Sequence, residues 1–313
     1  MKDHDSAPTE ADLDLIGREV VEARARRPPA PIPLSKSNAR ILDISPDEYH
    51  LRTGLSASIA TTLITRSPLH AWYEHPALGG HGRDATAEMD FGAVCHTLVL
   101  GNGKRFAECA YKDWRTDASK AARERHRADG LIPILTHHLE AAEECAAAVV
   151  RQLAERDIAL DGQSEIAVEW EEPSSRGPVL CRSMFDHAWI EDGAILDLKF
   201  VGNAESSQIE RSGERFGYAI QSHAYKRALT ALRPELEGRV GFLFAFAETD
   251  PPYALNLTEP DGALREIGER RWRRAVETWA ECMETYGAKQ PWPGYGRINQ
   301  LSAPAWALAR EEI

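Results

Sequence analysis

The order of apolar and polar residues changes along the chain, from helical patterns in the first half to alternating patterns after about residue 160. Ser67-Pro68 interrupts the first helical pattern, and Gly101 follows the second as a C-cap. Thr136 opens the third, alanine-rich pattern as an N-cap. The sequence therefore predicts a broken pair of helices over 56–76 and single helices over 85–100 and 135–156.

Three strands are predicted next. Apolar and polar residues alternate over 163–171 and, less cleanly, over 179–190, and an apolar run fills 194–200. Asp192-Gly193 separates the last two segments and is a strong signal for a hairpin turn. These strands should form an antiparallel meander.

The last third of the chain mixes both patterns. It predicts a helix at about 214–232, buried strands over 239–247 and 253–258, and a long helix at about 260–287. The whole order indicates an α/β or α+β fold with a helical N-terminal part. Residues 1–35 are polar and end in RRPPAPIP, which predicts a disordered tail before an ordered domain over 36–313.

Composition narrows the classes of protein. No apolar run approaches the roughly 20 residues of a membrane span, and the polar N-terminus lacks the core of a secretory signal, so we expect a cytoplasmic protein without a membrane partner. The five scattered cysteines argue against a disulfide framework or a cysteine-bound metal. The net charge of −12 is unusual for a nucleic-acid binder, which would need a local basic surface. The stretch 104–127 is the best candidate, with a plain solvated surface as the alternative.

The predicted hairpin allows its register to be counted on paper. A two-residue turn at Asp192-Gly193 pairs Asp186 with Lys199 and places Asp197 on the same face of the sheet. The two aspartates then become diagonal neighbours, roughly 7 Å apart at the backbone. Both carboxylates can therefore reach one cation.

The same count extends one strand earlier. If the loop 173–178 is symmetric, Glu165 lies opposite Asp186. Carboxylate oxygens suit Mg²⁺ or Mn²⁺, which can activate water at a phosphate, and Lys199 can orient that water or stabilise negative charge. The alternative is a solvated strand face with an ion pair. The apolar neighbours of Asp197 and Lys199 argue against it, because burying unpaired charges is costly.

Two further segments carry residues of interest. Gln221 and Tyr225 are four residues apart, so they share one helix face that can contact a nucleic-acid backbone. A core tyrosine beside a surface glutamine is the more common arrangement. His96 lies in an apolar helix, where a packed core histidine is the more common role and a metal ligand the alternative.

Five segments occur in the order found in PD-(D/E)XK nucleases: GAVCHTLVL, QSEIAVEW, CRSMFDHAWI, ILDLKF and AIQSHAYKRAL. Over about residues 36–310 the chain most resembles the RecE-like exodeoxyribonuclease VIII group of phages and prophages. The resemblance implies a restriction-endonuclease-like core, in which helices flank a central mixed sheet. It further implies Mg²⁺-dependent exonuclease activity on linear double-stranded DNA, 5′ to 3′, with a single-strand annealing recombinase as partner and a ring as one form of assembly.

The resemblance also assigns roles to residues. It implies metal ligands at His96, Asp186, Asp197 and the Leu198 carbonyl, a catalytic lysine at Lys199, an acidic catalytic position at Glu165 and a DNA-binding QxxxY motif at Gln221 and Tyr225. Two rival functions remain open from the sequence: an endonuclease with the same core, and a non-cleaving DNA-binding accessory of a recombinase.

Overall fold

A computed structural model of the chain describes residues 39–81, 85–296, 298 and 300–311, so the predicted tail over 1–35 lies outside the described residues. The helices are α3 Pro46–Leu51, α4 Ala57–Thr65, α5 Pro68–Glu74, α6 Ala87–Leu100, α7 Asp117–Ala128, α8 Thr136–Ala154, α9 Ser206–Phe216, α10 Tyr218–Leu232, η1 Pro234–Leu236, α11 Gly262–Tyr286 and α12 Ala305–Arg310. The strands are β1 Arg40–Leu42, β2 Phe106–Cys109, β3 Ile132–Leu135, β4 Gln163–Glu172, β5 Val179–Trp189, β6 Ala194–Val201, β7 Gly241–Glu248 and β8 Leu255–Thr258.

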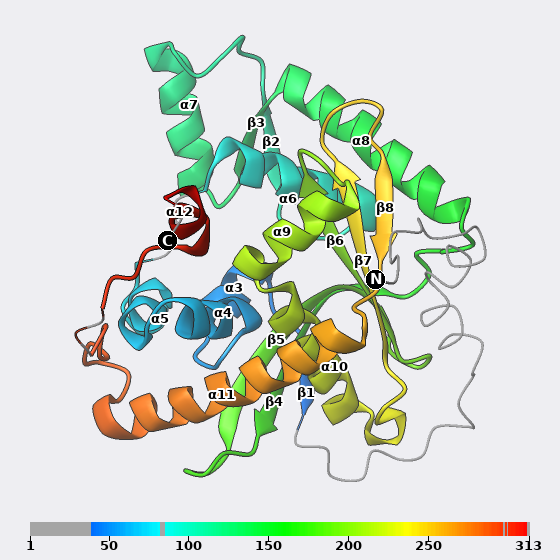
Figure 1. The fold of residues 1–313 in the computed structure, drawn as a ribbon. Coiled ribbons are helices and arrows are strands. Elements are labelled where there is room, and N and C mark those ends of the chain that lie inside the picture. Colours follow the sequence, from blue (N-terminus) through cyan, green and yellow to red (C-terminus); the bar gives the residue numbers. More distant parts are fainter. Residues whose placement is uncertain (1–38, 82–84, 297, 299, 312–313) are drawn as a thin grey trace.

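A mixed sheet forms the centre of the molecule (Figure 1). Among the described residues it has six strands in the order β1-β4-β5-β6-β7-β8. The predicted meander β4-β5-β6 is antiparallel, whereas β6 and β7 run parallel and are joined through α9 and α10. Such a parallel step needs a crossover connection, which these helices provide.

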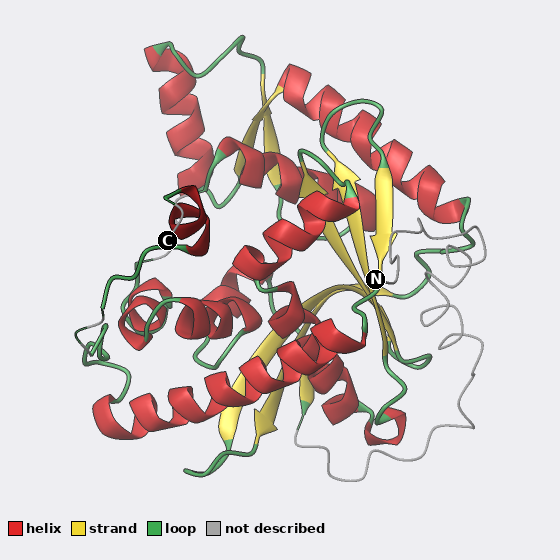
Figure 2. Ribbon diagram, in the orientation of Figure 1, coloured by secondary structure: helices red, strands yellow, loops and turns green. Residues whose placement is uncertain are grey.

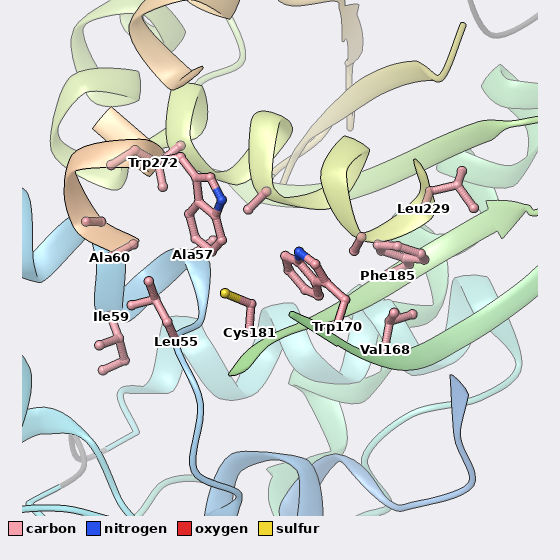
Figure 3. Close-up of a cluster of buried hydrophobic side chains, with 14 of the residues drawn as sticks. Leu55, Ala57, Ile59, Ala60, Val168, Trp170, Cys181, Phe185, Leu229 and Trp272 are labelled. Carbon is pink, nitrogen blue, oxygen red and sulfur yellow. The ribbon is translucent and has the colours of Figure 1, made fainter. Parts of the chain in front are cut away.

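Helices cover both faces of the sheet (Figure 2). One face packs against α4, α10 and α11, and the other against α6 and α8. Successive side chains of β7 alternate between these two cores, as the pleat requires: Phe242, Phe244 and Phe246 join the first, and Leu243, Ala245 and Ala247 the second. Figure 3 shows part of the first core, where Trp170 lies near Cys181, Phe185 and Trp272.

The central elements agree with the sequence prediction, including the break at Ser67-Pro68 and the C-cap at Gly101. All five cysteines are buried and unpaired. None of the described helices is long and apolar enough to cross a membrane.

Two local predictions are wrong. The helix predicted at 214–232 is two helices, because Gly217 adopts a left-handed conformation between α9 and α10. Thr136 is the first residue of α8 rather than its N-cap, since β3 runs directly into the helix and the Thr136 hydroxyl donates to Glu108. The region 100–135, for which the sequence predicted no element, contains α7 and the parallel pair β2–β3.

Candidate metal centre

Strand β5 has two very different edges. It pairs with β4 along nearly its whole length, but its ladder with β6 has only three pairs, from His187–Leu196 to Trp189–Ala194. Before His187 the two strands part, and Leu55 pairs with the freed edge of β5 beside Cys181. We call the opening between β5 and β6, bounded by Asp186 and by residues 197–199, the fork.

The turn that precedes the fork differs from the predicted one. Trp189 pairs with Ala194, so the connection has four residues, and the N–H groups of Asp192 and Gly193 both donate to the Trp189 carbonyl. The predicted pairing of Asp186 with Lys199 is therefore wrong by two residues. A shift of two keeps every side chain on its face, so the count would bring Asp186 opposite Asp197 if the ladder continued.

The fork leaves main-chain groups of β6 without a strand partner. The N–H of Leu198 donates instead to Oδ2 of Asp186, at 2.8 Å. Its carbonyl oxygen lies 3.0 Å from Nε2 of His96, which reaches the fork from α6. Two side chains thus take the place of a strand at Leu198, and both are suited to bind a cation.

Glu165 completes a three-residue cluster with His96 and Asp186. One ligand atom from each lies within 4.8 Å of the other two. Glu165 is also where the β4–β5 ladder skips a pair: Ser164–His187 and Ile166–Phe185 flank it, as the symmetric-loop count requires. Its φ of 56° is uncommon for a residue with a side chain, and such strain concentrates at functional sites.

The spacings fit a divalent cation. With bonds of about 2.1 Å, neighbouring ligands of an octahedral ion lie about 3.0 Å apart and opposite ligands about 4.2 Å. The distance from His96 Nε2 to the Leu198 carbonyl is 3.0 Å, and the distance to Asp186 Oδ2 is 3.8 Å. One imidazole, two carboxylates and a carbonyl form a donor set suited to Mn²⁺ or Mg²⁺.

Asp197 and Lys199 adjoin this cluster, and the Asp197 and Asp186 side chains share a hydrogen bond. Oδ2 of Asp197 forms an ion pair with Lys199, and Oδ1 accepts a hydrogen bond from Gln221 on α10, at 2.6 Å. Asp197 is fully buried, so both partners are needed to satisfy its charge. Of the four ligands that the resemblance implies, His96, Asp186 and the Leu198 carbonyl therefore come together, while Asp197 adjoins Asp186 and contacts Lys199 and Gln221.

Burial shifts the pKa values of the acids and the histidine at the fork. It raises the pKa of Asp197 to about 7 and also raises the pKa of Asp186, and Lys199 acts against both shifts. Burial, then the charge of Asp186, raises the pKa of Glu165 to about 7. Burial lowers the pKa of His96 to about 4, so its ring is neutral at pH 7, the form in which imidazole can bind a cation. Several acids that resist ionisation form a site that a cation would stabilise.

A cavity of about 290 Å³ opens next to Asp186. Its walls come from α4 (Ser56, the cap residue, and Ser58), from Phe216 at the end of α9, and from Gln221 and Tyr225 on α10. The two residues of the predicted QxxxY motif therefore face one cavity beside the candidate metal centre. Tyr225 also packs on Phe185, with ring centroids 5.4 Å apart.

Arg182 gives this cavity a positive charge. Only 2% of the residue is exposed, and its guanidinium donates to the carbonyls of Tyr49 and Gly54, at 3.0 and 3.4 Å. It also lies 4.6 Å from the centroid of the Tyr49 ring. Within the described part of the chain no carboxylate forms an ion pair with it. A buried guanidinium without a counter-ion, beside a metal-ligand cluster, suits a phosphate that contacts both.

Arg182 and Phe216 are candidate functional residues that were not predicted from the sequence. The alternation of side chains along a strand predicts the position of Arg182, because it lies four residues before Asp186 on the same strand and therefore on the same face. Phe216 gave no such signal, since its position depends on the unforeseen break at Gly217. In the basic stretch 104–127, Lys104 pairs with Asp47 and Arg127 with Asp90, which leaves fewer free cations than the sequence suggested.

Residues 67–301 match a family described as "PDDEXK-like domain of unknown function (DUF3799)". The matched segment includes the whole fork. A crystal structure from Eubacterium rectale, titled "Putative exonuclease", superposes with a TM-score of 0.55 at 11% identity, over 85% of this chain and 98% of that one. Its likeness shows a shared fold. No match was found among curated proteins.

Proposed function

Because this chain belongs to the family of PDDEXK-like domains of unknown function, we propose that it is a metal-dependent nuclease that degrades linear double-stranded DNA from its ends. The observation that carries the proposal is the fork, where His96, Glu165, Asp186 and the Leu198 carbonyl converge at spacings that suit a divalent cation. The fold shared with the Eubacterium rectale protein, which is named a putative exonuclease, also supports an exonuclease. The 5′-to-3′ direction, a Mg²⁺ cofactor and an annealing recombinase as partner rest on the resemblance of the motifs.

The residues of the fork divide the chemistry between them. His96, Glu165, Asp186 and the Leu198 carbonyl would hold the cation. When bound, such a cation lowers the pKa of a coordinated water and neutralises charge on a phosphate. Asp197 would act as a positioning residue, because its carboxylate fixes the Lys199 ammonium next to the cluster.

Lys199 fits the role of a charge stabiliser. Its ion pair with Asp197 favours the protonated ammonium, which cannot accept a proton from water. An ammonium directed at the phosphate would instead stabilise the negative charge that develops during attack. We therefore propose that Lys199 stabilises the transition state and does not bind the metal.

The cavity beside the fork supports a nucleic-acid substrate despite the acidic chain. Arg182 supplies a positive charge that forms no ion pair with a described carboxylate, and the hydroxyls of Ser56 and Ser58 line the same cavity. A local concentration of donors matters more for phosphate binding than net charge does. A polyanion would thus bind Arg182 on one side and the cation on the other.

The test compares end-labelled linear DNA with covalently closed DNA in the presence of Mg²⁺ or Mn²⁺, with the Lys199→Ala protein as the inactive control. Progressive loss of the linear form alone is expected. Nicking of closed DNA would instead show an endonuclease. Binding of both forms without cleavage by the unaltered protein would show an accessory that only binds DNA, and would overturn the proposal.

A further inference from the structure

The cavity has an exposed aromatic residue in its wall. Phe216 ends α9 and is 57% exposed, although its neighbours Gly217 and Tyr218 are buried. From this arrangement we infer that Phe216 is a stacking platform for one unpaired base of the DNA strand that enters the cavity. The inference rests on the proposed function and adds a residue that selects single-stranded ends.

The ring of Phe216 is supported from behind. It stacks on Tyr218, with centroids 6.1 Å apart and planes 24° from parallel, and Tyr218 packs in turn on Phe244. The guanidinium of Arg215 lies 5.4 Å from the centroid of the Phe216 ring. A ring held by a buried partner loses little conformational freedom when a base stacks on it, and the exposed Arg215 side chain can move aside for the base, so such a contact is favourable.

The backbone fixes where this ring lies. Gly217 has a φ of +74°, and a side chain there would collide with Thr61 of α4. The turn therefore brings the end of α9 close against α4, whose first turn lines the same cavity. Phe216 is thus held at the cavity by a conformation that strongly favours glycine.

An unpaired base is the ligand that fits. In a duplex both faces of each base are covered by neighbouring pairs, so an aromatic side chain can stack only on a base that has left the helix or ends a strand. A cavity of about 290 Å³ is at the small end of ligand sites and suits one nucleotide, not two strands. The neighbouring Arg182 provides the charge that a nucleotide's phosphate requires.

The experiment removes the base and the ring separately. Binding is measured in Ca²⁺ to limit cleavage. The DNA is a series of duplexes with a short single-stranded extension, and each duplex carries one abasic site at a different position of the extension. For the unaltered protein, removal of the base at one position of the extension should weaken binding roughly tenfold. In the Phe216→Ala protein the same abasic site should have an effect below about twofold, because the stacking partner is already lost.

Two controls separate this role from a structural one. Phe216→Trp should keep the dependence on that single position. Tyr73→Ala, which removes another exposed aromatic residue that does not line the cavity, should behave as the unaltered protein does. If the unaltered protein binds and cuts DNA but no abasic position depends on Phe216, the inference is wrong and the proposed function stands. If it neither binds nor cuts DNA, both fail.

Discussion

The two edges of β5 show how one strand serves both stability and chemistry. Along the β4 edge, paired residues run from Gln163–Ala188 to Glu172–Val179, with a single skip at Glu165. Along the β6 edge, three pairs are followed by the fork. The first edge satisfies its main-chain groups by strand pairing, whereas the second leaves Leu198 to the side chains of Asp186 and His96.

This difference explains where the polar residues of the core lie. A buried main-chain group needs a partner, so a fork inside a sheet is stable only where side chains supply one. Here those side chains are a carboxylate and an imidazole, which bind cations as well as main-chain atoms. The interruption of the ladder thereby creates the candidate site, and changes on the two edges should have different consequences.

We call the β4 edge of β5 the closed edge, and its β6 edge, which holds the fork, the open edge. The largest expected effect lies on the closed edge. Trp170 of β4 is 1% exposed, stacks on Trp272 and donates from its indole to Glu172. Trp170→Ala should lower the free energy of unfolding by about 3–5 kcal/mol, because it leaves a large cavity in the core. Urea denaturation measures the loss. The folded fraction of this variant should bind Mn²⁺ with unchanged affinity. A large loss of Mn²⁺ affinity would show that the two edges are not independent.

On the open edge, Asp186→Asn should abolish both metal binding and cleavage. The amide oxygen can still accept from the Leu198 N–H, so the fork should persist without the charge. We expect cleavage to fall roughly 100-fold or more, about 2.7 kcal/mol at the transition state.

Lys199→Ala should reduce cleavage by a similar factor while Mn²⁺ binding remains, since an ammonium is no ligand. Calorimetry with Mn²⁺ and single-turnover cleavage separate the two variants, with exposed Glu171→Gln on β4 as the control. Loss of Mn²⁺ binding in both variants would contradict the assigned roles.

The two edges of β5 also differ in how well the sequence predicts them. The closed edge is local: alternation and a symmetric loop were enough to place Glu165 opposite Asp186. The fork depends on contacts distant in the chain. Leu55 occupies the freed edge of β5, and His96 reaches it from α6. No periodicity encodes such contacts, and only the resemblance of the motifs favoured His96 as a metal ligand over a packed core residue.

The acids of the open edge should also make stability depend on pH. The folded protein holds protons on Glu165 and Asp197 up to about pH 7, whereas their ordinary pKa values are 4.5 and 3.8. Their contribution to stability is therefore complete below about pH 4 and is lost as pH rises through 7. In metal-free protein, Glu165→Gln should flatten this fall in melting temperature, and Glu171→Gln should not.

Added Mn²⁺ should reverse the trend, because it competes with those protons. The rise in melting temperature on adding Mn²⁺ should be larger at pH 8 than at pH 6. An equal rise at both values would mean that the cation does not bind at these carboxylates.

The smallest expected effect concerns the turn that sets the register of the open edge. Gly193 has a φ of +74°, and an added Cβ would lie 3.0 Å from Cδ1 of Leu236. Gly238 has nearly the same φ, +73°, but no atom within 4 Å of an added Cβ. Gly238→Ala should therefore cost about 1 kcal/mol from the backbone alone, and Gly193→Ala should cost more because Leu236 must also move. Urea denaturation of both variants gives the difference. If Gly193→Ala costs no more than its control, then Leu236 does not hold the four-residue turn in place, and its side chain moves at no cost.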